Sequence, residues 1–298
     1  MNKLSVQIHK PPIDLKETSL AIGFFDGLHL GHLELIQETK KSSYPSAVLT
    51  FTSDLKDKVE HKSKSLLLTD TEKDNTLSKL GVDYEYVLPF NRETMSTSQE
   101  DFIQFLKAIH CREIVVGDDF TFGSCAKGRA TDLLALKKDG ILVKIITLKE
   151  FDGSKISSTR IKKLLEQGDV KEANKLLGYP FFYTNKVIHG LHNGYILGFP
   201  TANMRFPKDK VLLPPGVYKT KTLIDGTCYD SMTNIGNHPT IDALNDNIVE
   251  TYILDQNINL YGKEVTVSFL DKIRDQICFS SIDELKTQLW HDKEACKS

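Results

Sequence analysis

The sequence has little of what marks membrane, secreted or nucleic-acid-binding proteins. No run of apolar residues approaches the roughly 18 that a membrane-spanning helix needs. Residues 1–19, MNKLSVQIHKPPIDLKETS, lack the apolar stretch of a secretory signal peptide. Lysine and arginine total 38 against 40 acidic residues, a net charge of −2, so there is no basic excess for nucleic acid. We therefore expect a cytoplasmic protein that binds neither membrane nor nucleic acid.

Cysteine is scarce and follows no pattern. There are five cysteines, an odd number, and no two of them form a C-x-x-C pair: Cys111, Cys125, Cys228, Cys278 and Cys296. Such scattered thiols predict neither a disulfide framework nor a zinc site. The pattern G-x-x-x-x-G-K-[ST] is also absent, which excludes a P-loop protein.

The composition that is present fits a globular protein of two domains. The chain has 298 residues, of which 40% are hydrophobic and 26% charged. In the first half, short apolar segments alternate with segments of helical spacing, which predicts βαβ units and a parallel sheet. The expected strands are 19–25, 46–51, 84–90, 112–117 and 142–148, and the expected helices are 31–42, 69–81, 98–110 and 130–140.

The second half has a different pattern of predicted secondary structure. Residues 157–181 predict one or two helices that end near Gly178 and Pro180. From 183 onward strand-like segments and turns follow one another, with a hairpin signal, Asp-Gly, at 225–226 and a final helix over 281–296. We therefore predict a domain over 1–182 and a second over 183–298. The second is expected to be an antiparallel β-barrel with a terminal helix.

The stretch GFFDGLHLGH at 23–32 places glycines and histidines directly after a predicted strand. Glycine lets the backbone approach a ligand closely, and a helix that opens at Gly31 and His32 presents free N–H groups to an anion. Open α/β sheets bind ligands at this edge. His29 and His32 are therefore candidates for contacting a phosphate. The ordinary alternative is a pair of surface histidines at a loop–helix junction.

Several motifs together resemble one known family. GFFDGLHLGH resembles the H-x-G-H signature of the nucleotidyltransferase superfamily, and KISSTRIKKLLEQG (155–168) resembles its second signature, I-S-S-T-x-x-R. VVGDDFTFG (115–123) stands between them. The second half adds GYILGFPTANM (194–204), LPPGVY (213–218), NIGNHPT (234–240), VETYILD (249–255) and LYGKEVTVSFL (260–270). In this order they resemble the bifunctional riboflavin kinase/FMN adenylyltransferase family, which implies a Rossmann-like nucleotidyltransferase domain followed by a riboflavin kinase-like barrel.

For the first domain, the resemblance implies that the FMN phosphate attacks the α-phosphorus of ATP, giving FAD and pyrophosphate. His29 and His32 would contact the α-phosphate. The residues that would shape the turn are Gly23, Phe25, Asp26 and Gly31. Those that would hold the other phosphates are Ser157, Ser158 and Thr159, with charge from Arg160 or Lys162. Asp119, Phe120 and Phe122 would contact the flavin. Ordinary alternatives are helix N-caps for the hydroxyls and core packing for the rings.

For the second domain, the resemblance implies phosphorylation of riboflavin to FMN with ATP and Mg²⁺. Thr201 and Asn203 in GFPTAN are two residues apart, so a strand places both oxygen-bearing side chains on one face. Mg²⁺ prefers such ligands together with phosphate oxygens. Glu250 occupies the family's catalytic-base position. The ordinary alternative is an acidic residue that faces solvent.

The sequence departs from the family pattern at four places. Lys162 replaces the arginine of the second signature, and TFTSDLKDKV (50–59) lacks the family's Phe-x-Pro-His-Pro stretch. HNGY (192–195) and His238 replace basic residues expected near the kinase phosphates. A loss of roughly 2–4 kcal/mol of transition-state stabilisation would slow transfer about 30- to 1000-fold.

Three functions therefore remain open at this point. The first is a bifunctional enzyme that makes FMN and FAD. The second is a monofunctional FAD synthetase whose second domain only binds flavin or stabilises a homo-oligomer. The third is a flavin-sensing regulatory protein without turnover.

Overall fold

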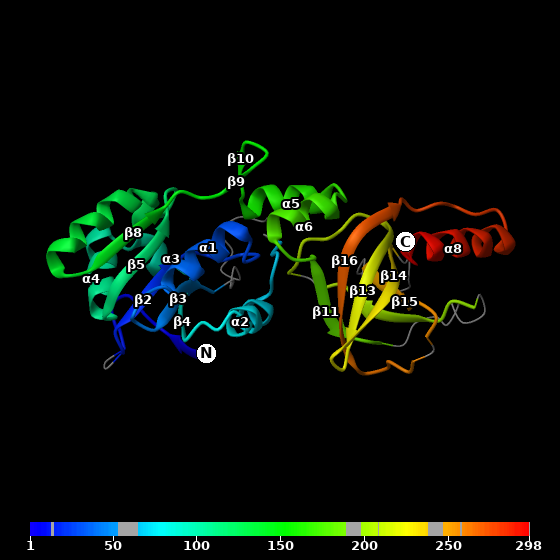
Figure 1. The fold of residues 1–298 in the computed structure, drawn as a ribbon, viewed down its shortest axis with the longest axis horizontal. Coiled ribbons are helices and arrows are strands. Elements are labelled where there is room, and N and C mark those ends of the chain that lie inside the picture. Colours follow the sequence, from blue (N-terminus) through cyan, green and yellow to red (C-terminus); the bar gives the residue numbers. More distant parts are fainter. Residues whose placement is uncertain are drawn as a thin grey trace. The chain divides into compact units, whose positions relative to one another are not determined.

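The structure is a computed structural model, which describes residues 1–12, 15–52, 65–188, 198–207, 209–237, 247–256 and 258–297. The chain divides into two compact units, Met1–Ser158 and Thr159–Ser298, coloured from blue to green and from green to red in Figure 1. The five cysteines are free thiols. In the described ranges, no helix has both the length and the apolar character needed to cross a membrane.

The first unit is built on a six-stranded, fully parallel sheet, as the alternating pattern predicted. The strand order is β1-β4-β3-β2-β5-β8. The strands span Asn2–Ser5 (β1), Thr18–Ile22 (β2), Ser46–Phe51 (β3), Tyr84–Leu88 (β4), Cys111–Gly117 (β5) and Leu142–Ile146 (β8). Two small hairpins complete the strands: β6 (Thr121–Phe122) with β7 (Gly128–Arg129), and β9 (Glu150–Phe151) with β10 (Ser154–Lys155).

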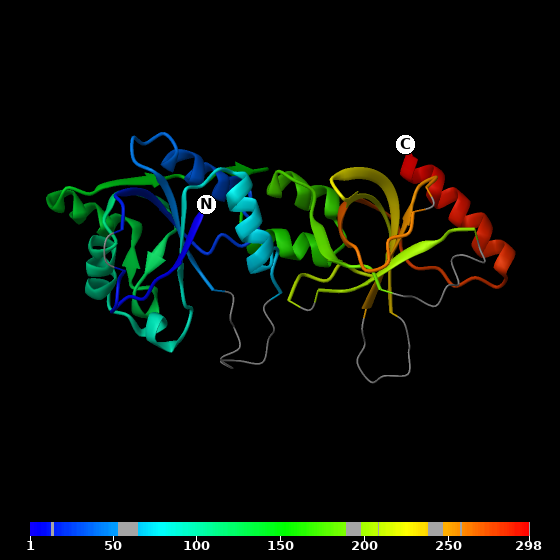
Figure 2. The same cartoon turned by 90° about the horizontal axis from the view of Figure 1, so that it is seen from below.

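Helices cover this sheet on both faces (Figures 1 and 2). They are α1 (Leu30–Thr39), α2 (Asp70–Lys79), α3 (Arg92–Ser96), α4 (Gln99–Ala108) and the 3-10 helices η1 (Ser124–Ala126) and η2 (Ala130–Asp139). The connection through α1 runs from β2 to β3, whereas the connection through α4 runs the opposite way along the sheet, from β4 to β5. Because such crossovers are right-handed, α1 and α4 lie on opposite faces. The direction of winding therefore changes between β2 and β5, which is where open sheets bind ligands.

The second unit contains the predicted antiparallel barrel with its terminal helix. Six strands pair in the order β11-β16-β13-β14-β15-β12, and a bridge from Ile188 to Asn203 nearly closes the ring. The strands span Phe182–Lys186 (β11), Thr201–Arg205 (β12), Gly216–Ile224 (β13), Thr227–Asn237 (β14), Asn247–Ile253 (β15) and Glu264–Arg274 (β16). The helices are α5 (Ser158–Glu166), α6 (Val170–Leu177) and the terminal α8 (Ile282–Lys297).

The division between the two compact units falls at Ser158/Thr159. Helix α6 packs on β16 of the barrel, where the Asn174 side-chain amide donates to the Phe269 carbonyl at 2.8 Å. The same side chain accepts the Phe181 N–H at 2.8 Å. These contacts tie the segment before β11 to the barrel, so it packs with the second unit.

The Asp-Gly hairpin signal is confirmed. Asp225 and Gly226 join β13 to β14 with φ angles of +47° and +82°. A two-residue loop with both residues in the left-handed region twists in the sense that the flanking strands require.

A row of hydroxyl groups crosses β13, β14 and β15. The five side chains are fully or almost fully buried: Thr222, Ser231, Thr220, Thr233 and Thr251. Successive oxygens in this order lie 2.8, 2.8, 2.8 and 2.9 Å apart. Because each hydroxyl can donate and accept, the row satisfies polar groups that would otherwise be costly to bury.

Two candidate active sites

A turn from the end of β2 to the start of α1 contains the histidine pair. It leaves the sheet at Gly23, whose N–H donates to the Leu49 carbonyl at 3.1 Å. Phe25, Gly27 and Leu28 have φ angles of +51°, +85° and +38°. Left-handed conformations at non-glycine residues cost free energy, and such residues concentrate at ligand sites. The turn ends at His29, the N-cap of α1.

The two imidazoles lie face to face. Their ring centroids are 3.6 Å apart with the planes at 15°. Nδ1 of His29 accepts the backbone N–H of His32 at 3.4 Å, so the neutral His29 ring bears its proton on Nε2. A Cβ atom added to Gly31 would lie 3.4 Å from the His29 ring. A glycine at this position therefore lets the first turn of α1 pass close to the imidazole.

Both imidazoles are uncharged at neutral pH in the ligand-free protein. Burial lowers the pKa of His29 to about 4, against the opposing effect of the Asp26 carboxylate. Burial, and then the neighbouring His29, hold the pKa of His32 well below its usual value. His29 is only 3% exposed. Nδ1 of His32 is buried and has no hydrogen-bond partner in the described part of the chain. These neutral rings offer N–H donors to an anion, whose charge would in turn favour their protonation.

Ser158 of the second signature contacts the histidine turn at Asp26. The Ser158 hydroxyl, which opens α5, donates to the Asp26 backbone carbonyl at 2.8 Å. The Asp26 carboxylate accepts the Leu67 N–H at 2.8 Å. Asp26 therefore shapes the turn and joins it to the segment before α2. Ser157 stands immediately before α5, so the free N–H groups of that helix begin beside this turn.

The remaining residues of the second signature follow on α5. Thr159 is exposed, and Arg160 and Lys162 are half-buried. Lys162 lies four residues after Ser158 and hence on the same helix face, whereas Arg160 faces elsewhere.

The loop after β5 stands beside the histidine turn. A Cβ added to Gly117 would lie 3.1 Å from the Asp119 carboxylate and 3.2 Å from Leu148. A Cβ added to Gly31 would lie 3.8 Å from the same leucine. Leu148 therefore separates Asp119 from the start of α1.

The two phenylalanines of this loop differ in burial. Phe120 is half-buried, whereas Phe122 is 6% exposed and packs in the core against Phe102, with ring centroids 5.2 Å apart. The centroids of Phe120 and Phe122 are 6.0 Å apart, in a stacked arrangement. Phe122 thus supports Phe120 from the core side, and packing accounts for its position here.

An aromatic group at this edge of the sheet was not predicted from the sequence. Phe24, Phe51 and Phe90 come from the ends of β2, β3 and β4, and their rings contact one another. The adjacent aromatic residues in GFFDG were the sequence signal for this group. Neighbouring side chains at the end of a strand point in different directions, and here Phe25 is buried whereas Phe24 is exposed.

In the second unit, Glu250 stands at the centre of a row of polar side chains. It lies directly opposite Asn203 of β12 and opposite Asn234 of β14. The Asn234 amide donates to the Glu250 carboxylate at 3.2 Å. The Asn203 side chain is 6% exposed, and its amide donates to the Thr201 carbonyl at 3.3 Å. Asn234 was not predicted, because its proximity depends on the pairing of β14 with β15.

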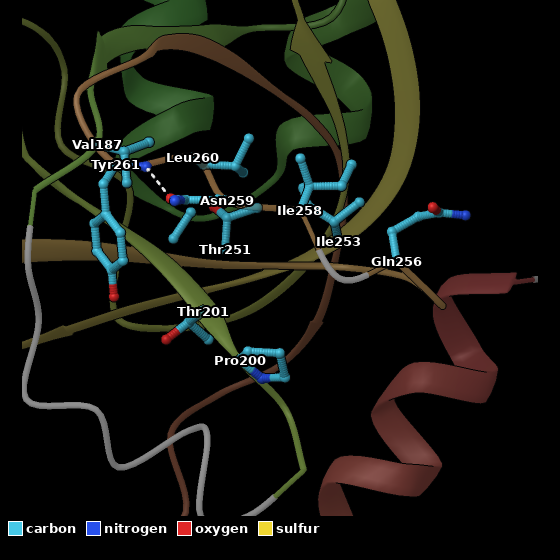
Figure 3. Close-up of a pocket in the computed structure, with 11 residues that line it drawn as sticks. Val187, Pro200, Thr201, Thr251, Ile253, Gln256, Ile258, Asn259, Leu260 and Tyr261 are labelled. Carbon is cyan, nitrogen blue, oxygen red and sulfur yellow. Dashed lines mark hydrogen bonds between the residues drawn. The ribbon is translucent and has the colours of Figure 1, made fainter.

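A cavity of about 420 Å³ is lined in part by β12 and β15, the strands that bear Asn203 and Glu250 (Figure 3). Its walls come from the start of β12, from β15, from the segment before β16 and from the residue after β11. They combine apolar with polar side chains: Val187, Pro200, Thr201, Ala202, Thr251, Ile253, Gln256, Ile258, Asn259, Leu260 and Tyr261. The volume and the mixture of groups are those of small-molecule sites. Thr201 belongs both to the cavity wall and to the strand that bears Asn203.

Some predicted features lie outside the described residues. These are HNGY (192–195), His238 and the part of TFTSDLKDKV from 53 to 59. Among the residues that are described, no group of three or more histidine, cysteine, aspartate or glutamate side chains is arranged to hold a metal ion. A Mg²⁺ held by Thr201, Asn203 and phosphate oxygens does not need such a group.

The fold and the two sites define a class of protein: a transferase with an H-x-G-H turn at the switch point of a parallel sheet and a second site on a β-barrel. A family model described as FAD synthetase matches residues 12–160, and one described as riboflavin kinase matches 177–298. The chain belongs to the bifunctional riboflavin kinase/FMN adenylyltransferase family, as the motifs predicted.

Individual relatives cover nearly the whole chain. The bifunctional riboflavin kinase/FMN adenylyltransferase of Listeria monocytogenes is 34% identical over 92% of this chain and 90% of its own length. That of Haemophilus influenzae is 35% identical over 98% and 97%. The crystal structure of a macrolide-efflux protein from Streptococcus pneumoniae is similar with a TM-score of 0.89 at 33% identity, covering 100% of this chain and 99% of that one.

Proposed function

We propose that this chain phosphorylates riboflavin to FMN in its second unit and transfers an adenylyl group from ATP to FMN in its first. The observation that supports this most strongly is the meeting of two motifs 132 positions apart, where Ser158 donates to the turn that holds His29 and His32. One edge of the sheet thereby gathers two imidazoles and the starts of two helices, α1 and α5. These groups match the charge of a triphosphate.

In the adenylyl transfer, an FMN phosphate oxygen forms a bond to the α-phosphorus of ATP. The bond from that phosphorus to the oxygen bridging to the β-phosphate breaks, and pyrophosphate leaves with the electron pair. The nucleophile is already an anion, so alignment and charge neutralisation suffice. His29 donates through Nε2 and His32 through its ring to the oxygens of the α-phosphate. Ser157, Ser158, Thr159, Arg160 and Lys162 hold the β- and γ-phosphates, while Gly23, Phe25, Asp26 and Gly31 maintain the turn.

The flavin lies on the Asp119 side of the histidine turn. Asp119 and Phe120 contact it, and Phe122 keeps Phe120 in place. Asp119 is exposed beside Leu148 and the start of α1, which suits a hydrogen bond to a ligand.

In the kinase step, Glu250 accepts the proton of the ribityl hydroxyl, whose oxygen then forms the bond to the γ-phosphorus as ADP leaves. The Asn234 amide orients the carboxylate through its 3.2 Å hydrogen bond. The nucleotide base occupies the cavity of Figure 3, where apolar walls such as Ile258 and Leu260 cover its faces. Thr201 and Asn203 suit Mg²⁺, which when bound neutralises phosphate charge.

The functional boundary is proposed near residue 182, with an adenylyltransferase domain over 1–182 and a kinase domain over 183–298. Helix α5 bears the second signature of adenylyl transfer, so by function it belongs with the first domain although it packs with the second unit. The free cysteines agree with a reduced compartment, and we propose the cytoplasm. A homo-oligomer stays a prediction.

The test is a product assay on the purified chain with ATP and Mg²⁺, supplied with either riboflavin or FMN. FAD from riboflavin supports both activities. FAD only from FMN indicates a monofunctional FAD synthetase, and no product from either indicates a protein without turnover.

Two substitutions separate the sites. His32→Ala is expected to lower FAD formation from FMN at least 100-fold and to leave FMN formation from riboflavin unchanged, because only the first site loses a phosphate donor. Glu250→Gln is expected to do the reverse, since it removes the base while keeping the shape. The exposed residues His9 and Glu264 provide the matched controls His9→Ala and Glu264→Gln. Loss of both products in either variant would contradict separate sites.

A further inference from the structure

Three phenylalanine rings form a compact group next to the histidine turn, which we call the phenylalanine patch: Phe24, Phe51 and Phe90. Phe24 lies against Phe51 with centroids 4.6 Å apart and planes at 27°. Its edge meets Phe90 at 5.0 Å and 78°, and Phe51 lies 6.0 Å from Phe90. The rings of Phe51 and Phe90 are half-buried and hold the ring of Phe24 in place.

Phe24 is exposed at a position where the backbone is fixed. Its side chain is 51% exposed, and in the described part of the first unit it is the only aromatic among the exposed large apolar side chains. Its carbonyl accepts the Thr50 hydroxyl at 3.2 Å, and the next residue, Phe25, is held at φ +51° with its ring fully buried. The turn therefore holds an aromatic face at the ligand-binding edge of the sheet.

The patch and the Asp119 loop flank the histidine turn from opposite sides. Phe51 ends β3, and Asp119 follows β5, which are the two neighbours of β2 in the sheet. Two strand spacings separate β3 from β5, which is about 10 Å. A ligand ring that touches both sides must be long, and the flavin is tricyclic whereas adenine is bicyclic.

We infer that Phe24 is a stacking residue for the isoalloxazine ring of FMN, which extends across the histidine turn to Asp119 and Phe120. This inference rests on the proposed adenylyl transfer. ATP is anchored by three phosphates, whereas FMN brings one. More of the binding free energy of FMN must therefore come from its ring, and an exposed aromatic face supplies it.

The assignment predicts an effect on flavin binding and not on chemistry. Stacking of a planar ring on an aromatic side chain corresponds to a change of about 10-fold in affinity when the side chain is truncated to alanine. Phe24→Ala is therefore expected to raise the KM for FMN about 10-fold in FAD formation from FMN. The kcat and the KM for ATP should stay within about two-fold, because the phosphates do not contact this ring.

Two variants accompany this measurement. Phe24→Trp keeps an aromatic face and should restore the KM for FMN. Leu134→Ala truncates another exposed apolar side chain of the first unit, which is 48% exposed, and should change nothing. Lumiflavin, which has the isoalloxazine ring without the ribityl phosphate, should inhibit Phe24→Ala about 10-fold less strongly than the wild type.

An unchanged KM for FMN in Phe24→Ala would overturn the assignment. A rise in the KM for ATP in place of that for FMN would also overturn it, because it would indicate that adenine stacks on Phe24. Failure of the proposed function looks different, because then the wild type makes no FAD from FMN. In that case, the assignment is tested by the affinities of the wild type and of Phe24→Ala for lumiflavin, measured from its fluorescence. Binding to Phe24→Ala that is 10-fold weaker supports the assignment, and equal binding overturns it.

Discussion

At the scale of single residues, the histidine turn depends on two rings kept neutral by burial. The Nδ1 of His29 accepts a backbone N–H, so its remaining donor is Nε2. Burial lowers the pKa of His29 to about 4, although Asp26 acts in the opposite direction. A bound triphosphate would add negative charge beside both rings and raise their pKa values.

ATP binding is therefore expected to take up protons. Because the His29 pKa lies near 4 without ligand and rises with it, uptake should be largest where the bound and free proteins differ in protonation, from about pH 5 to pH 7. Titration calorimetry in buffers of different ionisation enthalpy measures the protons taken up. The uptake should fall in His29→Ala and persist in the control His9→Ala. Equal uptake in wild type and His29→Ala would contradict the role of this ring.

At the scale of elements, much of the fold was predictable because its signals are local. The expected helix over 69–81 is α2, whose N-cap Thr69 and Glu72 form a capping box. The expected strand over 46–51 is β3, and the Asp-Gly pair makes the predicted hairpin. H-x-G-H was visible for the same reason, since both histidines lie on one turn.

What the sequence did not reveal depends on pairing across the sheet. Strand β1 is mostly exposed and is defined by its parallel ladder with β4, in which Lys3 lies opposite Glu85. Asn234 reaches Glu250 only through the register of β14 and β15. The phenylalanine patch likewise gathers three strand ends that are distant in sequence. No local pattern encodes such neighbours.

Helix α2 packs beside an acidic residue buried in β4. Glu85 has no exposed surface, and burial followed by the nearby Asp74 of α2 raises its pKa to about 7. The Lys3 ammonium pairs with Asp74 at 2.6 Å. The folded pKa of Glu85 is thus above its ordinary value of 4.5, so its contribution to stability is fully present below pH 4.5 and is lost as pH rises through 7.

Replacing this carboxyl should flatten the pH dependence of stability. Between pH 5 and pH 8.5 the wild type should lose about 2–3 kcal/mol of unfolding free energy through this group, and Glu85→Gln should lose much less. Urea unfolding followed by far-UV circular dichroism measures the difference. Glu264→Gln on an exposed position is the control. Equal slopes in the wild type and Glu85→Gln would show that the group does not titrate in this range.

At the scale of the whole molecule, two units with separate cores imply that unfolding is not a single event. Leu20 is fully buried in the core of the first unit, and Phe269 in that of the second. The single tryptophan, Trp290, lies on α8 against Phe199 and so reports on the second unit alone.

We expect two thermal transitions, of which tryptophan fluorescence follows one. Leu20→Ala should shift only the transition of the first unit, which tryptophan fluorescence does not detect. Phe269→Ala should shift only the transition of the second unit, which fluorescence does detect. Each substitution should lower the unfolding free energy of its unit by the 2–5 kcal/mol typical of such core truncations. Calorimetry and fluorescence on the same samples test this. A single transition moved by both substitutions would mean that the units unfold together.

The buried hydroxyl row of the barrel has a consequence for its cavity. Thr251 ends the row and also forms part of the cavity wall. Each hydroxyl hydrogen can rotate toward either neighbour, so the five can reverse their polarity in concert. The hydroxyl group of Thr251 can thereby present either a proton or a lone pair to a molecule bound in the cavity, without movement of any non-hydrogen atom.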